Sequence, residues 1–364
     1  MNNNMIHFGS VSVGEGKPCV VIAEGCDNHG GSLTKAKEMA AAAKESGADI
    51  IKFQLHLPDE EMVKDEMDKV SSGGAFKQWG SLYGFIKAHQ LSVEGHADLM
   101  AYCKKIGIEY LCTPFSLRAA ELLRDMGATA FKIGSGETED LPMLEEVAKM
   151  GKPMMIATGM TTKEELDGTV TTMRAIGTPF CLAHCISVYP VKRLRDLHFG
   201  TIAAYRERYD VPVGWSDHTP PEGITDEESG RQFSENEILA VALGCGAKFI
   251  EKHFTLDRAT KDADSYFSHD PQTLKSLVEN VRLWERALKE RDGVLTGEKG
   301  VRLWAKRSLV AVADITRGTP LTRELFTSKR PGVGVLSKGY KAVLGKKASR
   351  DIAAGEIIYP KDLL

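Results

Sequence analysis

The sequence has no apolar run near the ~20 residues that a membrane-spanning helix needs. It also has no excess of positive charge, because 47 Lys and Arg against 50 Asp and Glu leave a net charge of −3. This balance excludes the basic surface that nucleic acids or anionic membranes attract. Residues 1–4 carry neither the basic nor the apolar region of a signal peptide. We therefore expect a cytoplasmic protein with no nucleic acid or membrane partner.

Cysteine is sparse and irregularly placed. The seven cysteines are an odd number, and Cys181 and Cys185 lie four residues apart, which is not the CxxC spacing of a zinc ribbon or a thioredoxin. Most of the cysteines fall within expected strands or helices, where cysteine behaves as a small apolar residue. We interpret them as reduced core thiols and expect neither a structural disulfide nor a zinc site.

One unit recurs along the chain: a helical segment, a glycine at its end, and a short apolar run. A glycine just past a helix adopts the left-handed conformation at low cost, and continuous apolar runs are typical of buried parallel strands. Eight strands are expected, at residues 19–24, 49–54, 109–113, 130–134, 153–158, 180–185, 212–216 and 248–253. Their alternation with helices predicts an α/β fold, a (β/α)8 TIM barrel. The alternative is a doubly wound sheet, but residues 25–31 (GCDNHGG) match its phosphate-binding turn poorly.

Several helix starts are marked in the sequence. Ser32, Ser116 and Thr161 each precede a helical segment and are expected N-caps. Thr161 and Glu164 have the spacing of a capping box.

Polar residues gather at the carboxyl ends of the expected strands. Those ends carry Glu24, Lys52, Gln54, Thr113, Lys132, Ser135, Glu137, Thr158, His184, residues 216–218 and residues 251–253. Barrel enzymes place their chemistry at this face. One polar strand end could arise by chance, but eight are hard to explain by packing alone, so we expect the active site there.

The composition changes near residue 290. The barrel is expected over residues 1–290, and residues 291–305 predict a linker because they contain glycines and mixed charge. Residues 306–364 predict a small, β-rich domain with a repeated Asp-Ile-x-x-Gly segment at 314–318 and 351–355. A module of this size buries little core and is expected to pack against a neighbour.

The motifs of both parts resemble those of the sialic acid synthases. The matching barrel segments are 22–31 (IAEGCDNHGG), 49–54 (DIIKFQ), 132–137 (KIGSGE), 156–160 (IATGM), 213–219 (VGWSDHT) and 250–256 (IEKHFTL). In the tail, residues 306–310, 329–334 and 345–355 resemble the antifreeze-like (SAF) domain of that family. The resemblance runs in order over nearly the whole chain.

The resemblance implies a transferase of sialic acid biosynthesis, an N-acetylneuraminate-type (nonulosonate) synthase. Such an enzyme condenses phosphoenolpyruvate with an N-acyl hexosamine, giving a nine-carbon 3-deoxy-2-keto acid and phosphate. The resemblance also implies a barrel followed by a SAF domain, and a domain-swapped homodimer.

His218 and His253 are the expected metal ligands. They lie at the ends of two expected strands, and the resemblance supports a divalent cation there. A Lewis acid would stabilise the alkoxide that develops on the aldehyde oxygen. An open site of nitrogen and oxygen ligands suits Mn²⁺, with Mg²⁺ or Co²⁺ as alternatives.

Lys52 and Lys132 are the expected anion-binding residues, because phosphoenolpyruvate is a compact anion that needs fixed cations and donors. By resemblance, both lysines and Thr113 hold its carboxylate and phosphate. Hydroxyl groups for substrate binding are also expected from Ser135, Ser187 and Ser216. A Schiff base on a lysine is less favoured, because phosphoenolpyruvate is already an activated enol.

The resemblance assigns the remaining site residues. Glu24 matches the carboxylate placed to orient the water that adds to C2 of phosphoenolpyruvate, and Glu137, Asp264 and Tyr189 match positions that contact the sugar. Arg330 matches an arginine that the SAF domain delivers to the barrel of the other protomer.

Some positions depart from the family pattern. Ala157 replaces a common serine, Ser187 a common asparagine, and Ser265 a common histidine. Residues 220–236 are an acidic insertion, interpreted as a solvated loop or, alternatively, as a lid or dimer contact. These departures leave the identity of the sugar open.

Four alternative functions are considered. The acceptor could be 6-phosphorylated, or a diamino-dideoxy sugar as in legionaminate and pseudaminate synthesis. The chain could also be a metal-dependent pyruvate aldolase. A dead barrel that carries an ice-binding or other binding module is disfavoured, because the histidines and lysines are present.

Overall fold

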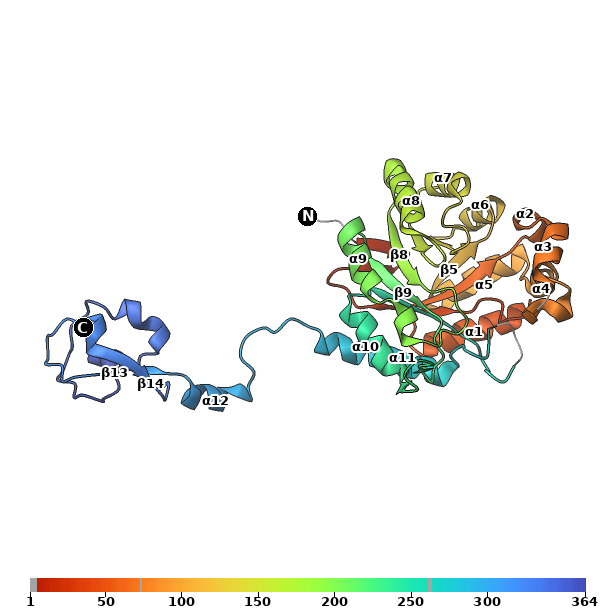
Figure 1. Ribbon diagram of the computed structural model, residues 1–364. Coiled ribbons are helices and arrows are strands. Elements are labelled where there is room, and N and C mark those ends of the chain that lie inside the picture. Colours follow the sequence, from red (N-terminus) through yellow and green to blue (C-terminus); the bar gives the residue numbers. More distant parts are fainter. Residues whose placement is uncertain (1–4, 73, 261–263) are drawn as a thin grey trace. The chain divides into compact units, whose positions relative to one another are not determined.

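The computed structural model describes residues 5–72, 74–260 and 264–364 (Figure 1). The chain divides into two compact units, Met1–Lys289 and Glu290–Leu364. Residues 1–4, which bear on the expected absence of a signal peptide, lie outside the described residues. Among the described helices, none is long and apolar enough to cross a membrane.

The first unit is built around eight parallel strands, as the sequence predicts. In spatial order they are β5 (Glu109–Pro114), β4 (Ile50–Leu55), β3 (Val20–Glu24), β12 (Phe249–His253), β9 (Val213–Asp217), β8 (Phe180–Cys185), β7 (Met154–Ala157) and β6 (Phe131–Ile133). The two strands at the ends of this order, β5 and β6, also pack together, so the barrel is nearly closed. The doubly wound alternative is therefore wrong.

Helices alternate with these strands and surround the barrel. They are α1 (Leu33–Glu45), α5 (Val93–Ile106), α6 (Leu117–Met126), α7 (Leu141–Lys149), α8 (Lys163–Ile176), α9 (Gly200–Tyr209), α10 (Glu235–Gly244) and α11 (Pro271–Ala287). Glycines in the left-handed conformation end several of them; Gly107 has φ 74° and Gly177 has φ 86°. Their apolar faces join the outer faces of the strands in one large core.

The expected caps are correct at two positions and shifted at the third. The hydroxyls of Ser32 and Ser116 accept hydrogen bonds from backbone N–H groups of their helices. The cap of α8 is Thr162, with Glu165 completing the capping box, rather than Thr161 with Glu164. The segment TTKEE fits the box in two registers, and Thr161 instead donates to the carbonyl of Gly159.

A hairpin that the sequence pattern does not predict packs against the interior of the barrel. Strands β1 (Met5–Phe8) and β2 (Val11–Gly14) pair antiparallel. Their buried side chains, Ile6, Phe8 and Val13, join the interior cluster of strand residues that includes Phe249. An interior filled in this way is a packed core and not a pore.

Two insertions extend from the carboxyl-terminal face. Between β4 and α5 the chain forms α2 (Pro58–Glu61), α3 (Lys64–Ser71), η1 (Gly74–Trp79) and α4 (Leu82–His89), which gather at one side of the barrel (Figure 1). Within residues 220–236, β10 (Ile224–Thr225) and β11 (Gln232–Phe233) form a small hairpin, so this insertion contains regular structure. Residues 227–231 at its tip are exposed.

The second unit has its own core. Strands β13 (Ser308–Ala311) and β14 (Phe326–Lys329) pair antiparallel. The two Asp-Ile-x-x-Gly segments pair with each other through Ile315 and Ile352. The N–H of Ile315 donates to the carbonyl of Ile352 at 2.8 Å, and the reverse hydrogen bond is 2.9 Å long. The second half of the predicted linker is a helix, α12 (Glu298–Ala305).

Phe8→Ala should destabilise the barrel by about 3–5 kcal/mol, because this side chain is fully buried in the interior cluster and its removal leaves a cavity. Urea unfolding followed by tryptophan fluorescence measures the loss. The matched control is Met5→Ala in the same strand, where the side chain is 37% exposed and a change within about 0.5 kcal/mol is expected. If the two substitutions lowered the free energy of unfolding equally, burial of the Phe8 side chain in the interior cluster would not stabilise the barrel.

Candidate active site

The strand ends open into one cavity of about 1140 Å³ on the first unit. All twelve barrel residues named above as site candidates line it: Glu24, Lys52, Thr113, Lys132, Ser135, Glu137, Ser187, Tyr189, Ser216, His218, His253 and Asp264. They come from seven of the eight strands or from the loops that follow them. Barrel folding therefore brings residues separated by up to 240 positions to one place.

A buried cluster of opposite charges lies at the centre of the cavity. The carboxylate of Glu251 is 3.1 Å from the ammonium nitrogen of Lys132 and 3.4 Å from that of Lys52. Ser216 donates a hydrogen bond of 2.9 Å to the same carboxylate, and Lys52 also contacts Glu24. These charged groups lie on four different strands and are at most 4% exposed. Glu251 thus links the two lysines from across the barrel.

The pKa values of this cluster follow from burial and pairing. Burial would raise the pKa of Glu251, but Lys132 and Lys52 outweigh it and hold that pKa below its usual range. Burial would lower the pKa of Lys52, but Glu24 and Glu251 raise it above the usual range. Burial lowers the pKa of Lys132, although the negative charge of Glu251 acts in the opposite direction. The cluster is therefore a fixed set of charges suited to an anion.

Hydroxyl groups line the cavity beside the lysines. Thr113 accepts a hydrogen bond of 3.4 Å from Lys52, and Ser135 accepts one of 3.1 Å from the N–H of Gly159. A Cβ atom at Gly159 would come within 2.3 Å of the Ser187 hydroxyl and 2.7 Å of the Ser135 hydroxyl. Glycine at this position therefore allows the two hydroxyls to converge. Ala157, the last residue of β7 and two residues before Gly159, contributes no hydroxyl.

Glu24 is held by neighbours on strand β4 and in the loop after β3. Its Oε1 atom accepts hydrogen bonds from the backbone N–H of Cys26 at 2.8 Å and from the Gln54 amide at 3.4 Å. Its Oε2 atom contacts Lys52. These contacts fix the orientation of the carboxylate beside the lysines.

His218 and His253 lie next to each other at the ends of β9 and β12. Their ring centroids are 5.3 Å apart. Nδ1 of His218 donates to the carbonyl of Ile186 at 2.7 Å, which leaves the lone pair of Nε2 free for a metal ion. Burial and the neighbouring His253 lower the pKa of His218 to about 3, so the imidazole is neutral. Neutral imidazoles are the form that binds metal ions.

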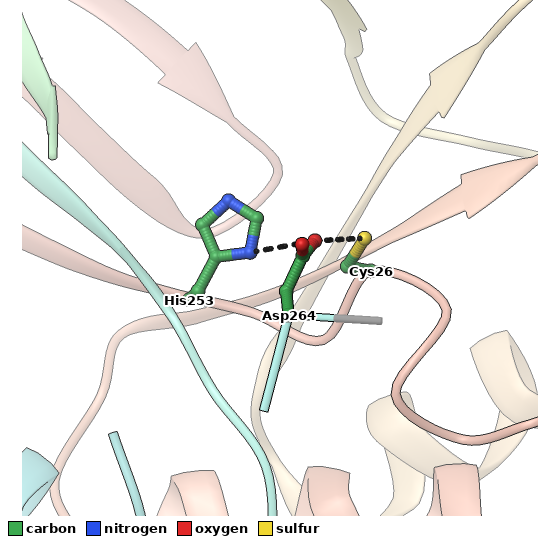
Figure 2. A group of neighbouring side chains, drawn as sticks. All are labelled: Cys26, His253 and Asp264. Carbon is green, nitrogen blue, oxygen red and sulfur yellow. Dashed lines mark hydrogen bonds and ion pairs between the residues drawn. The ribbon is translucent and has the colours of Figure 1, made fainter. Parts of the chain in front are cut away.

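A second set of potential metal ligands includes His253 but not His218. Cys26, His253 and Asp264 present one ligand atom each, all within 4.8 Å of one another (Figure 2). All seven cysteines are free, as the sequence predicts, and six are buried. Cys26, however, turns its sulfur toward Asp264 in the cavity and is not simply a core side chain.

The cavity wall also carries a cluster of carboxylates around one histidine, His56. Nδ1 of His56 is 3.1 Å from the Glu61 carboxylate, and Asp27 lies 3.8 Å from Nε2. Burial raises the pKa of Asp27 to about 6 and that of Glu137 to about 7. One oxygen each of Asp27 and Glu137 is buried without a hydrogen-bond partner. These oxygens are available to hydroxyl or amide donors of a ligand.

The α2–α4 insertion adds an apolar wall to the cavity. The wall consists of Met62, Met67, Phe76, Trp79, Leu82, Phe85 and Ile86. Tyr189 also lines the cavity, with its ring centroid 4.2 Å from that of His218. A ligand in this cavity therefore meets both buried charged groups and apolar or aromatic side chains.

Arg330, the remaining predicted site residue, lies in the second unit. It is exposed, and its guanidinium carbon lies 5.9 Å from the centroid of the Trp304 ring of α12.

Glu251 was expected only as a polar residue at a strand end, and no site role was predicted for Cys26 or His56. Glu251 could have been found from the period of two in a strand, because it lies on the same face as His253. The intervening Lys252 points away from this face and pairs with Asp217 at 2.7 Å. No local pattern marks Cys26.

Glu251→Gln should lower the free energy of unfolding at neutral pH by about 3–5 kcal/mol, because two buried lysines lose their shared counter-charge. A carboxyl with a lowered folded pKa stabilises the protein above its unfolded pKa of about 4.3, and that contribution is lost as the pH falls through the folded value. Urea unfolding should therefore show a difference in the free energy of unfolding between wild type and variant that is smaller at pH 4 than at pH 7. Glu146→Gln, at a half-exposed ion pair with Lys149, is the control and should change stability by less than about 1 kcal/mol. A difference in the free energy of unfolding that is larger at pH 4 than at pH 7 would contradict the assignment of Glu251 as the charged partner of the two lysines.

Comparison with known proteins matches both units. Residues 39–292 match the model of the NeuB family, and residues 306–364 match that of the SAF domain. An N,N'-diacetyllegionaminic acid synthase of Legionella pneumophila is 31% identical over 98% of this chain and 97% of its own. The N-acetylneuraminate-9-phosphate synthase of Homo sapiens is 34% identical over 87% of this chain and 84% of its own.

A solved structure agrees with this result. The N-acetylneuraminic acid synthetase of Leptospira borgpetersenii is 26% identical and superimposes with a TM-score of 0.69, covering 82% of this chain and 94% of that one. The family match spans more than half of the sequence, in the order of the motifs noted above. The chain is therefore an enzyme of the NeuB family, with a SAF domain at its carboxyl-terminal end.

Proposed function

We propose that this enzyme condenses phosphoenolpyruvate with an N-acyl hexosamine to give a nine-carbon 3-deoxy-2-keto acid and phosphate. The observation that carries the proposal is the pair of buried lysines, Lys52 and Lys132, held by Glu251 in a cavity that also contains His218 and His253. Family membership supports the same chemistry, because relatives of this chain are named as synthases of such acids. The proposed compartment is the cytoplasm.

The lysines bind the phosphate and carboxylate of phosphoenolpyruvate in this proposal. Ser135, Ser187 and Ser216 add hydroxyl donors, and Thr113 orients Lys52. The proposed reaction forms a bond between C3 of phosphoenolpyruvate and the aldehyde carbon of the sugar. Water then adds to C2, and the bond between C2 and the phosphate oxygen breaks.

Glu24 is the residue proposed to orient that water. Its carboxylate is fixed by the N–H of Cys26 and by Lys52, so it can hold a water molecule beside the bound enol. Glu137 and Asp264 would bind hydroxyl or amide groups of the sugar, and Tyr189 would cover it. A divalent cation held by His253 and His218 would supply a Lewis acid for the aldehyde oxygen.

The cavity favours an acceptor without a phosphate group. Once Lys52 and Lys132 are assigned to phosphoenolpyruvate, Arg258 is the one other Lys or Arg among the described lining residues. Arg258 is already paired with the carboxylate of Glu222. The wall of α2–α4 is apolar, and the buried Asp27 and the half-buried Glu137 would repel a phosphate if charged. A free N-acyl hexosamine fits this surface, and so does a deoxy sugar with a second amide.

A phosphate-release assay with phosphoenolpyruvate tests the reaction. Release of phosphate should require an acceptor sugar. The value of kcat/KM should be at least about tenfold higher for N-acetylmannosamine or a 2,4-diacetamido-2,4,6-trideoxyhexose than for N-acetylmannosamine 6-phosphate. A tenfold difference corresponds to about 1.4 kcal/mol.

Lys132→Met should lower kcat/KM for phosphoenolpyruvate by roughly 30-fold or more, because a charged contact of about 2–3 kcal/mol is lost. Lys149→Met, at a half-exposed surface pair, is the control. Turnover without phosphate release would favour the pyruvate aldolase.

We further propose that the SAF domain completes the site in a homodimer by delivering Arg330 to the barrel of a second copy. The sequence resemblance supports this, and Arg330 is exposed on its own unit. Residues 291–297 could span roughly 23 Å if extended at ~3.3 Å per residue, and α12 adds about 12 Å at ~1.5 Å per residue. That length permits an exchange of tails between two copies.

Subunit exchange between His253→Ala and Arg330→Ala tests the exchanged tail. Each variant alone should be inactive or nearly so. In a swapped dimer, the mixture pairs the intact barrel of one chain with the intact tail of the other, so up to one competent site per mixed dimer should appear. Mixed dimers are confirmed by differential tagging. Their formation without recovered activity would exclude the exchange and leave the barrel chemistry intact.

A further inference from the structure

We propose that His56 is a positioning residue for Glu24. In this proposal His56 is protonated on both ring nitrogens, and it fixes the amide of Gln54 so that the amide NH2 group donates to the Glu24 carboxylate. The inference rests on the proposed function, in which Glu24 orients the water that adds to C2 of phosphoenolpyruvate. His56 lies directly after β4, and its side chain lines the cavity.

Four side chains form one hydrogen-bonded row from the α2–α4 insertion to the barrel. Both carboxylate oxygens of Glu61, the last residue of α2, lie 3.1 Å from Nδ1 of His56. Nε2 of His56 lies 3.1 Å from Oε1 of Gln54. Nε2 of Gln54 lies 3.4 Å from Oε1 of Glu24. The row therefore begins and ends at a carboxylate.

The two carboxylates determine where the hydrogens of the row lie. A carboxylate only accepts hydrogen bonds, so the amide of Gln54 must turn its NH2 group toward Glu24. The carbonyl oxygen of that amide then faces His56, and Nε2 of His56 must donate to it. Nδ1 of His56 must donate to Glu61 for the same reason. Both ring nitrogens thus carry a hydrogen, and His56 is an imidazolium cation.

A neutral His56 would reverse the direction of the row. With a hydrogen on Nδ1 alone, Nε2 becomes an acceptor and attracts the NH2 group of Gln54. The carbonyl oxygen of Gln54 would then face the Glu24 carboxylate, and two acceptors would repel each other. Glu24 would keep its contacts with Cys26 and Lys52 but lose the donor on its Gln54 side. The charge on His56 therefore controls the orientation of Glu24.

The surroundings of His56 stabilise its positive charge. Burial by itself would lower the pKa of His56, but Glu61 and Asp27 raise that pKa above its ordinary value. The carboxylates that face the ring are Glu61 from α2, Asp27 from the loop after β3 at 3.8 Å, and Glu137 from the loop after β6. His96 of α5 is a further titratable neighbour. The negative charge around the ring exceeds the single positive charge that it carries.

The plane of the ring is fixed by a stacked aromatic side chain. His56 lies on Phe115, with ring centroids 4.3 Å apart and ring planes at 10° to each other. Phe115 follows β5, whereas Glu61 belongs to α2. Contacts from two separate elements therefore hold the donor that Gln54 faces. The proposed influence of His56 on the reaction passes through Gln54 to Glu24.

Nitrogen NMR of the full-length protein with isotope-labelled histidine tests the charge. Both ring nitrogens of His56 should give the imidazolium signal at pH 7, with a titration midpoint above the ordinary histidine value of about 6.5. His56→Gln assigns the signal. Glu61→Gln should lower the midpoint, because an amide can donate to Nδ1 as well as accept from it. A neutral His56 at pH 7 would overturn the inference.

Glu60→Gln is the matched control for the titration. Glu60 precedes Glu61 in α2 but is exposed and does not line the cavity among the described residues. This substitution should leave the midpoint of His56 unchanged. If Glu61→Gln also left it unchanged, the row would not hold the charge on His56, and the inference would fail.

Phosphate release tests the link from His56 to Glu24. His56→Asn and Gln54→Leu should each lower kcat by at least about tenfold, because a positioned acid or base contributes roughly 10²–10⁴-fold. KM for phosphoenolpyruvate should change by less than about threefold, because the lysines proposed to bind it are untouched. The double variant should lose no more than the larger single loss, because both substitutions break the same row. Losses that multiply would show that the two residues act independently and would exclude positioning.

Glu61→Gln supplies a kinetic test that keeps the histidine. As the pH is raised, kcat of this variant should fall at a lower pH than kcat of the wild type, because His56 loses its proton earlier. An unshifted pH profile would contradict the inference. If no acceptor sugar supports phosphate release, the proposed function fails, but the NMR titration still decides the charge on His56. If phosphate is released while His56 is neutral, positioning fails and the proposed function stands.

Discussion

The carboxylate of Glu251, shared between Lys52 and Lys132, is the interaction on which the site depends. Two ammonium groups placed in a barrel interior would repel each other and lose their hydration. A buried anion on a third strand offsets both effects, since it lies 3.4 Å from one lysine and 3.1 Å from the other. The arrangement fixes both lysines in position beside a shared counter-charge, which is what recognition of a compact anion requires.

Strand β12 connects this charged centre with the edge proposed to bind the cation. Glu251 and His253 lie on one face of the strand, so the residue that holds the lysines and the residue proposed to hold the cation are fixed in one rigid element. Lys252, between them, faces the other way into a fully buried ion pair with Asp217, which anchors β12 to β9. The two substrates of the proposed reaction would thus be positioned by a single strand.

Much of the fold was predictable because its signals are local. Each of the eight expected strands lies within two residues of an observed one, since a buried parallel strand is a continuous apolar run bounded by a helix-ending glycine. The shift from Thr161 to Thr162 shows the limit of such signals, because two registers of the capping box fit one sequence. The β1–β2 hairpin and the α2–α4 insertion were not anticipated, because short elements carry too little periodicity to be recognised.

The sequence by itself determined which polar side chains reach the carboxyl-terminal face of the barrel and which family the chain resembles. Period-two alternation and strand ends are properties of neighbouring residues, so they can be read along the chain. Only the tertiary structure decided that Glu251 lies between the two lysines and that the sulfur of Cys26 faces Asp264. Those contacts join residues 119 and 238 positions apart, and they depend on strand order and loop path, which no local pattern encodes.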